Sequence, residues 1–225
     1  MTWIKICGMT NLEDALAAVD AGVDAVGFVF YEKSPRKITA EAASEVVRKL
    51  PQHLEKVGVF VDAACDSIRD TVSQAGLTAV QLHGKVSMNS VRQDSRTTVE
   101  SVGVSKLILM IPGSALVDGG IFMSEKVHEG TFAVLIDAEL NGVSGGTGAT
   151  FDWKATQGIV RSIGIGLPVI VAGGLTPFNV EEAIILFRPW GVDVASGVEA
   201  SPGKKDPDRV RAFVKAVRDI DRKTS

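Results

Sequence analysis

The stretch PVIVAGGLTP, residues 168–177, holds the pattern that decides the fold. It begins with a short apolar run, continues through the glycine pair Gly173 and Gly174, and ends with Thr176 directly before a proline. A continuous apolar run is typical of a strand that is covered on both faces. A capping side chain before proline is typical of the start of a helix. The stretch therefore predicts a buried strand, a glycine loop and a helix, in that order.

The same order recurs along the whole chain. Eight short apolar runs rich in β-branched side chains are expected to be strands: 3–7, 25–30, 57–61, 78–82, 107–111, 132–136, 168–171 and 192–195. Their ends lie about 27 residues apart on average, which leaves room for a loop and a helix between parallel strands. Thr10 and Glu13 form a capping box, and Asp206 stands before a proline, so helices are expected to begin there. Eight βα units predict an α/β fold, a (β/α)8 TIM barrel that forms a single domain over residues 1–225.

An open, doubly wound sheet also alternates strands and helices and is the competing architecture. The nucleotide fingerprints of that class are missing, because no G-x-G-x-x-G follows the first run and no G-x-x-x-x-G-K-[ST] occurs anywhere. No linker or low-complexity tract marks a second domain. The pattern is weakest over residues 111–131, where two glycine-containing turns leave the fifth helix poorly defined.

The composition argues against several classes of function. The chain carries 24 basic and 27 acidic residues, a formal net charge of −3, which disfavours an electrostatic grip on nucleic acid or on an anionic membrane. Two cysteines, Cys7 and Cys65, do not make a disulfide framework. No apolar run is long enough to span a membrane, and no signal-peptide pattern opens the sequence. We therefore expect a reduced, cytoplasmic protein without nucleic-acid or membrane partners.

Candidate site residues follow from the barrel, whose active sites lie at the carboxyl ends of the strands. The side chains with suitable chemistry at or just beyond those ends are Cys7, Arg36, Asp62, Gln81, His83 and Asp137. The loops after the last three strands are rich in glycine, which lets backbone N–H groups approach an anion closely. Their candidate phosphate-binding residues are Gly145, Gly146, Gly173, Gly174, Ser196 and Gly197. Phosphate held after strands seven and eight is the common arrangement in this fold.

Each of these side chains also has a structural explanation. Cys7 is either a reactive thiol at the barrel mouth or an inert core cysteine, and Asp137 is either a reactive carboxyl or a loop cap. Arg36 is either a ligand for an anion or a solvated loop charge. Gln81 and His83 are either pocket lining or satisfied core groups.

Asp62 is either a site residue at the end of its strand or the cap of the helix that Cys65 opens. Cys65 itself is expected to pack on the outer ring. The three histidines, His53, His83 and His128, are scattered, and no spacing resembles a metal site.

Several motifs then follow one another along the chain. They are KICGMT (5–10), GFVF (27–30), SPR (34–36), VGVFVD (57–62), VQLHG (80–84), LIDA (135–138), GGTG (145–148), FDW (151–153), AGGL (172–175) and DVASGVE (193–199). Together they resemble the phosphoribosylanthranilate isomerase family, and the resemblance runs from residue 4 to about 215. The KICG start combined with the GGTG loop is specific, whereas other phosphate-binding barrels share only the glycines after strands seven and eight. The match is loose at 86–131.

The resemblance implies an isomerase of tryptophan biosynthesis that uses no metal and no organic cofactor. Its small-molecule phosphoribosyl substrate would be N-(5-phosphoribosyl)anthranilate, an aminoaldose. An Amadori rearrangement would convert it to the aminoketose 1-(2-carboxyphenylamino)-1-deoxyribulose 5-phosphate. The family's pattern puts the general base at Cys7, the general acid at Asp137 and the contact to the anthranilate carboxylate at Arg36. For a base, the thiol pKa is expected below its reference of about 8.5. We expect a monomer or a homodimer.

Two other functions remain open at this point. One is a related phosphate barrel that acts on another aminoaldose, such as the isomerase of histidine biosynthesis. Those barrels usually use a pair of aspartates at strands one and five, where this chain has Cys7 on strand one. The other is a sugar-phosphate binding module that has lost catalysis, which the presence of both Cys7 and Asp137 argues against.

Overall fold

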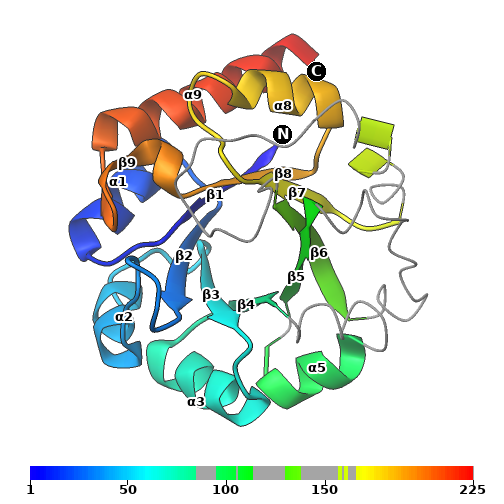
Figure 1. Cartoon of the computed structure of the whole chain (residues 1–225). Coiled ribbons are helices and arrows are strands. Elements are labelled where there is room, and N and C mark those ends of the chain that lie inside the picture. Colours follow the sequence, from blue (N-terminus) through cyan, green and yellow to red (C-terminus); the bar gives the residue numbers. More distant parts are fainter. Residues whose placement is uncertain are drawn as a thin grey trace.

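The computed structural model describes residues 1–84, 95–104, 106–113, 130–137, 157–158, 160–161 and 166–224. Within them, eight parallel strands pair in sequence order and close into a barrel, with β1 hydrogen-bonded to β8 (Figure 1). The strands are β1 Trp3–Cys7, β2 Ala25–Phe30, β3 Glu55–Val61, β4 Ala79–His83, β5 Leu107–Pro112, β6 Thr131–Asp137, β7 Val169–Ala172 and β8 Gly191–Val194. Every predicted strand is present, and the predicted (β/α)8 barrel is confirmed.

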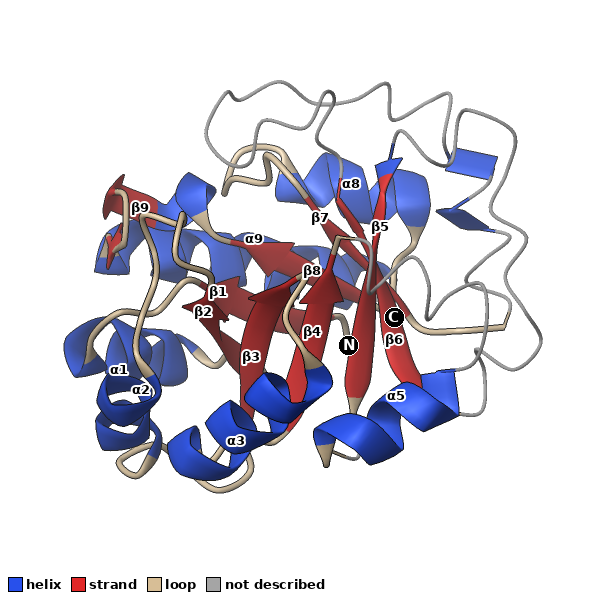
Figure 2. Ribbon diagram, turned by 60° about the horizontal axis from the view of Figure 1, so that its bottom comes forward, coloured by secondary structure: helices blue, strands red, loops and turns tan. Residues whose placement is uncertain are grey.

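Helices surround the barrel on its outside (Figures 1 and 2). Those with described bounds are α1 Leu12–Ala21, α2 Ala40–Val47, α3 Cys65–Ala75, α5 Ser95–Val102, α8 Val180–Phe187 and α9 Pro207–Thr224. After β8 come a 3₁₀ turn at Ser196–Val198 and a small hairpin of β9 Glu199–Ser201 and β10 Lys204–Lys205. No helix in the described part of the chain is long and apolar enough to cross a membrane. Most of the weakly patterned stretch 111–131 lies outside the described residues.

The start of α1 differs from the predicted capping box. Asn11, not Thr10, caps the helix, because its Oδ1 accepts a hydrogen bond from the backbone N–H of Asp14 at 2.9 Å. The Thr10 hydroxyl instead donates to the carbonyl of Gly203 at 2.6 Å, so a tertiary contact occupies the side chain that the pattern assigned to the helix. The predicted cap at Asp206 is confirmed, since its Oδ1 accepts from two N–H groups in the first turn of α9.

The helix after β7 begins later than predicted, at Val180. Thr176 and Asn179 hold the preceding residues in a turn. The Thr176 N–H donates to Asn179 Oδ1 at 2.7 Å, and the Thr176 hydroxyl accepts from the Phe178 N–H at 3.2 Å. Thr176 therefore closes a turn in front of α8 rather than capping the helix.

Cys65 opens α3, as predicted, and packs against the apolar core. Asp62 does not cap that helix, because the N-cap is Ala64 and makes no side-chain hydrogen bond. The backbone of Asp62 has a φ of 48°, in the left-handed region. Its carboxylate lies beside Gly84, where an added Cβ would come within 2.5 Å of Oδ1. The turn at Asp62 thus places the side chain beside the end of β4.

Alternate residues of each strand face the inside of the barrel. On β1 these are Trp3, Lys5 and Cys7, from the amino end to the carboxyl end. The apolar interior comprises Ala25, Val57, Ala79, Ile108, Ala133, Leu135, Ile170 and Ala172, with Trp3, Met110 and Phe132 packed against them. Trp3 stacks on Trp190 with ring centroids 5.2 Å apart, and Phe132 meets Trp190 edge-on at 5.4 Å. Aromatic rings therefore fill the amino-terminal end of the barrel.

Candidate active site

A cavity of about 240 Å³ lies at the carboxyl ends of the strands. The predicted site residues that line it are Cys7, Arg36, Gln81, His83, Asp137, Gly173, Gly174 and Ser196. They come from three different strands, β1, β4 and β6, and from loops that follow strands, so the closed barrel brings together residues that are far apart in sequence. Gly145 and Gly146, which were also predicted, lie outside the described residues.

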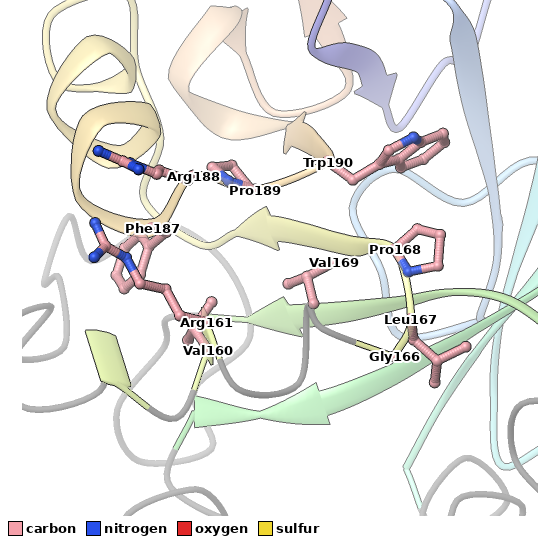
Figure 3. A pocket seen from close by; sticks show the side chains of 10 residues that line it. All are labelled: Val160, Arg161, Gly166, Leu167, Pro168, Val169, Phe187, Arg188, Pro189 and Trp190. Atoms are coloured by element: carbon pink, nitrogen blue, oxygen red, sulfur yellow. The ribbon is translucent and has the colours of Figure 1, made fainter.

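A second cavity, of about 540 Å³, lies at the other end of β7 and β8 (Figure 3). Its lining consists of Val160, Arg161, Gly166, Leu167, Pro168, Val169, Phe187, Arg188, Pro189 and Trp190. None of these described residues is a predicted site residue, and the ionisable groups among them are two arginines. Active sites of this fold lie at the carboxyl end of the strands. The smaller cavity, which holds a thiol, carboxyl groups and an imidazole, is therefore the candidate active site.

The thiol of Cys7 is buried at the end of β1, with 8% of the residue exposed. Gly27 on β2 makes room for it, because a Cβ at Gly27 would lie 2.7 Å from the sulfur. Burial raises the pKa of the thiol above its ordinary value, although the positive charges of Lys5, Lys205 and Arg36 work in the other direction. This direction is opposite to the one expected from the sequence, because desolvation outweighs the nearby charges.

Below Cys7 lies a buried polar layer in which Lys5 and Asp193 join the predicted residues Gln81 and His83; Lys5 and Asp193 were not among the predicted site residues. The ammonium of Lys5 is fully buried, lies 3.1 Å from Asp193 Oδ2 and donates to Gln81 Oε1. Gln81 also contacts His83, with 2.5 Å between Nε2 of Gln81 and Nε2 of His83. Burial raises the pKa of Asp193, and burial together with the charge of Lys5 lowers the pKa of His83 to about 4. His83 is therefore neutral near pH 7.

A sequence signal for this layer existed. Lys5 and Asp193 are single charges inside the apolar strands WIKIC and GVDV, and both stand at positions that face inward. They lie opposite each other in the register of β1 and β8. Gln81 and His83 were predicted to be either pocket lining or satisfied core groups. They are both, because they line the cavity and belong to a hydrogen-bonded network. Oδ1 of Asp193, a residue that also lines the cavity, has no hydrogen-bond partner among the described residues.

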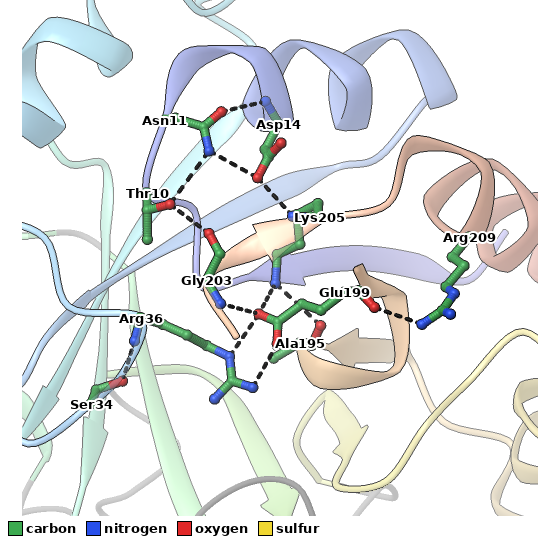
Figure 4. Close-up of polar contacts among 10 residues, drawn as sticks. All are labelled: Thr10, Asn11, Asp14, Ser34, Arg36, Ala195, Glu199, Gly203, Lys205 and Arg209. Atoms are coloured by element: carbon green, nitrogen blue, oxygen red, sulfur yellow. Dashed lines mark hydrogen bonds and ion pairs between the residues drawn. The ribbon is translucent and has the colours of Figure 1, made fainter. Parts of the chain in front are cut away.

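Arg36 lies at the edge of the cavity and is held by Glu199 (Figure 4). Its Nε donates to Glu199 Oε1 at 2.8 Å and its Nη2 to Oε2 at 2.7 Å, a bidentate pair. Lys205 Nζ also donates to Oε1, at 2.9 Å. Burial works to raise the pKa of Glu199, but the hydrogen bonds and charges of Arg36 and Lys205 outweigh it and hold the pKa below its ordinary value. Arg36 is thus an ordered side chain, not a solvated loop charge.

Asp137 ends β6 and lines the cavity together with Cys7. The loops after β7 and β8 contribute backbone to the same cavity. Gly173 and Gly174 have φ values of +85° and +64°, a left-handed conformation that glycine adopts without strain. A Cβ at Gly197 would lie 1.9 Å from the carbonyl oxygen of Leu175, so only glycine allows the two loops to approach this closely.

Fold and site together define a (β/α)8-barrel enzyme site with a thiol, a carboxyl group and glycine loops around one cavity. A family model described as N-(5'-phosphoribosyl)anthranilate (PRA) isomerase matches residues 4–216. The chain is similar to the N-(5'-phosphoribosyl)anthranilate isomerase of Geotalea uraniireducens, with 42% identity over 98% of this chain and 100% of the relative. The corresponding protein of Geobacter sp. is 45% identical over 95% of this chain and 97% of the relative.

Solved structures agree. The crystal structure of phosphoribosyl anthranilate isomerase from Thermotoga maritima matches with a TM-score of 0.80 and 38% identity, over 97% of this chain and 100% of that one. A structure of such an isomerase in complex with reduced 1-(o-carboxyphenylamino)-1-deoxyribulose 5-phosphate matches with a TM-score of 0.74 and 35% identity, over the same shares. The chain belongs to the family of N-(5'-phosphoribosyl)anthranilate isomerases.

Proposed function

We propose that this protein catalyses the Amadori rearrangement of N-(5-phosphoribosyl)anthranilate in tryptophan biosynthesis, with Cys7 as general base and Asp137 as general acid. The observation that carries the proposal is that Cys7, Asp137 and Arg36 line one cavity, next to the glycine loops of β7 and β8. Membership of the isomerase family supports the reaction, and the complex of a relative with a reduced 5-phosphate supports a phosphoribosyl ligand.

The chemistry asks for two proton transfers. Asp137 protonates the ring oxygen of the ribose, the ring C–O bond breaks, and the nitrogen lone pair forms an iminium ion. Cys7 then removes the proton from the adjacent carbon, and the electrons of that C–H bond move to the iminium nitrogen to give a neutral enolamine. Tautomerisation of the enolamine gives the ketone. Because the iminium nitrogen accepts the electrons, the proposed steps need neither a metal nor an organic cofactor.

The raised pKa of Cys7 fits a base that is activated by its substrate. In the described structure burial favours the neutral thiol. The iminium ion places a positive charge beside the sulfur during the reaction, and an opposite charge at short range favours the ionised form. Lys5, fully buried below Cys7, contributes a further positive charge. As the cation forms, the thiol releases its proton to water, and the resulting thiolate is the base that removes the proton from carbon.

The two ends of the substrate would be held by different parts of the site. Backbone N–H groups at Gly173, Gly174, Ser196 and Gly197 would bind the phosphate, with Gly145 and Gly146 completing the cradle. Arg36 would bind the anthranilate carboxylate. Anchoring at both ends places the reacting carbons between Cys7 and Asp137.

The domain organisation, the location and the oligomeric state complete the proposal. We propose that residues 1–225 form a single domain, since the barrel strands run from Trp3 to Val194 and α9 packs against both α1 and α8. We propose a cytoplasmic monomer or homodimer. One solved relative, from Thermotoga maritima, is described as dimeric.

The test combines a growth assay with an enzyme assay. The gene should restore growth without tryptophan to an auxotroph that lacks this isomerase, and purified protein should convert the aminoaldose to the aminoketose. Cys7→Ala is the matched negative control. Folded wild-type protein that does neither would overturn the proposal. Turnover of a histidine-pathway aminoaldose instead would favour the related barrel, and binding without turnover would favour a binding module.

A further inference from the structure

Arg36 belongs to a chain of buried charges that includes Glu199 and Lys205 (Figure 4). The side chain of Lys205 is fully buried, that of Glu199 is 5% exposed and that of Arg36 is 12% exposed. Lys205 and Arg36 meet on the same carboxylate oxygen, Glu199 Oε1, which also accepts from the Gly203 N–H at 3.3 Å. Neither Glu199 nor Lys205 has a role in the proton transfers, so burying two such charges beside the cavity needs another reason.

The bidentate contact decides how the guanidinium is presented. Glu199 engages the edge formed by Nε and Nη2. A guanidinium has a second edge, formed by its two Nη atoms, that can also make two parallel hydrogen bonds to a carboxylate. By holding the first edge, Glu199 fixes the plane and direction of the guanidinium.

The aliphatic part of Arg36 is also held in place. Gly8 has a φ of +82°, and a Cβ there would lie 2.6 Å from Cδ of Arg36, so the stem of the arginine lies directly against the backbone beyond β1. Ser34 Oγ accepts a hydrogen bond from the Arg36 N–H at 3.1 Å. The arginine is therefore oriented before any ligand binds, and such pre-organisation lowers the entropy cost of binding.

Lys205 extends the same network to the other end of the site. Its Nζ donates to the carbonyl of Ala195 at 3.2 Å, next to Ser196 in the 3₁₀ turn after β8. One buried ammonium thus contacts both the carboxylate that orients Arg36 and the backbone that leads into the proposed phosphate loop.

We propose that Glu199 and Lys205 are positioning residues that orient Arg36 for a ligand carboxylate, and that they make the site select substrates that carry one. The proposal rests on the function proposed above and deepens it. The proposal predicts that replacing Glu199 weakens the binding of a ligand carboxylate. If Glu199 merely competed with the ligand for Arg36, replacing Glu199 would strengthen that binding instead.

The experiment measures the dissociation constants of two ligands by calorimetric titration. One is the reduced 1-(o-carboxyphenylamino)-1-deoxyribulose 5-phosphate, and the other is the same compound without the carboxyl group. We expect the wild-type protein to prefer the first, and Glu199→Gln to reduce this preference at least tenfold while changing the affinity for the second less than about twofold. Arg36→Met should abolish the preference, and adding Glu199→Gln to Arg36→Met should change it no further.

Two other variants distinguish the orientation of Arg36 from a general loss of protein stability. Arg209→Met is the matched control, because Arg209 Nη1 donates to the backbone carbonyl of Glu199 at 2.6 Å and not to its carboxylate, so the preference should stay unchanged. Lys205→Met should reduce the preference and should also weaken competition by inorganic phosphate. Thermal unfolding of each variant shows that the protein titrated is folded.

The outcomes are distinct. A stronger affinity of Glu199→Gln for the carboxylated ligand, or an equal loss for both ligands, would overturn the positioning role and leave the proposed function standing. Wild-type protein that binds both ligands equally would overturn the positioning role together with the carboxylate contact proposed for Arg36, and would leave the proposed reaction standing. Wild-type protein that binds neither ligand would overturn both proposals.

Discussion

The two ends of the barrel are built from the same strands but differ in chemistry. On β1, Trp3 lies at the amino end among aromatic rings, and Cys7 lies at the carboxyl end in the candidate active site. Both side chains face the barrel interior, and only Lys5 stands between them at an inward position. The position of an interior residue along its strand therefore decides whether it packs or reacts. Substitutions at the two ends should separate stability from activity.

The border between the two ends is the charged pair of Lys5 and Asp193. A buried ion pair contributes little net stability, but removing one partner leaves the other charge buried and uncompensated. This layer supports the cavity from below while the apolar residues beneath it form an ordinary core. Changes at this border should affect both properties at once.

The largest effect is expected at that border. Lys5→Met should lower the free energy of unfolding by about 3–5 kcal/mol, because it leaves the Asp193 carboxylate without its partner. It should also raise the pH at which the rate increases as Cys7 ionises, since Lys5 is the strongest of the charges that lower the pKa of Cys7. Urea denaturation and the pH dependence of kcat/KM measure the two. The double variant Lys5→Met/Asp193→Asn should recover part of the stability, and failure to do so would show that the pairing is not the cause.

At the carboxyl end, Cys7→Ala and Asp137→Asn should each lower kcat by at least about 100-fold, the lower end of acid–base contributions. The free energy of unfolding should change little, because neither substitution empties a large core volume. Steady-state kinetics alongside urea denaturation measures both quantities. Cys65→Ala, on the outer ring, is the matched control and should keep its kcat. Near wild-type turnover in either site variant would remove that residue from the mechanism.

At the amino end the opposite pattern is expected. Trp3→Ala should lower the free energy of unfolding by about 2–3 kcal/mol, somewhat less than for a fully buried tryptophan. It removes the stack on Trp190, while kcat should stay within about twofold because the cavity at the other end is unchanged. A fall in kcat comparable to the fall in Cys7→Ala would show that the two ends are coupled.

The smallest effect concerns pH. The pKa of His83 is lowered to about 4 by burial and by Lys5, whereas an unfolded histidine titrates near 6.5. Between these values the unfolded chain binds a proton that the folded protein does not, so stability should fall as the pH falls from about 6.5 towards 4. The expected loss is about 1 kcal/mol between pH 7 and pH 5.5, and it grows below that. Urea denaturation at pH 7, 5.5 and 4.5 measures the slope. His83→Gln should show a shallower slope over this range, and parallel slopes would contradict the assignment.

Much of the fold was predictable from the sequence because it depends on local patterns. Eight apolar runs with intervening helix signals predicted the eight strands of a (β/α)8 barrel, and the strand ends predicted where the reactive groups would lie. Cys7, Arg36, Gln81, His83 and Asp137 do line one cavity. The cap at Asp206 was also predictable, since the side chain and the N–H groups that it accepts from are neighbours in sequence.

Features that depend on partners distant in sequence were not predictable. The sequence pattern predicted Thr10 as a helix cap, but its hydroxyl donates to the carbonyl of Gly203, 193 residues away. Arg36 could be placed at the cavity, but its orientation depends on Glu199 and Lys205, which reach it only through the closed barrel.

The ionisation of the site shows the division most clearly. From its sequence position Cys7 was expected to have a lowered thiol pKa, whereas burial raises it in the folded protein. The sequence by itself determined which residues stand at the ends of which strands, because strand and helix periodicity are local properties of the chain. Only the tertiary structure decided how those residues are charged and paired, because desolvation and Coulomb energy depend on every group that folding brings near.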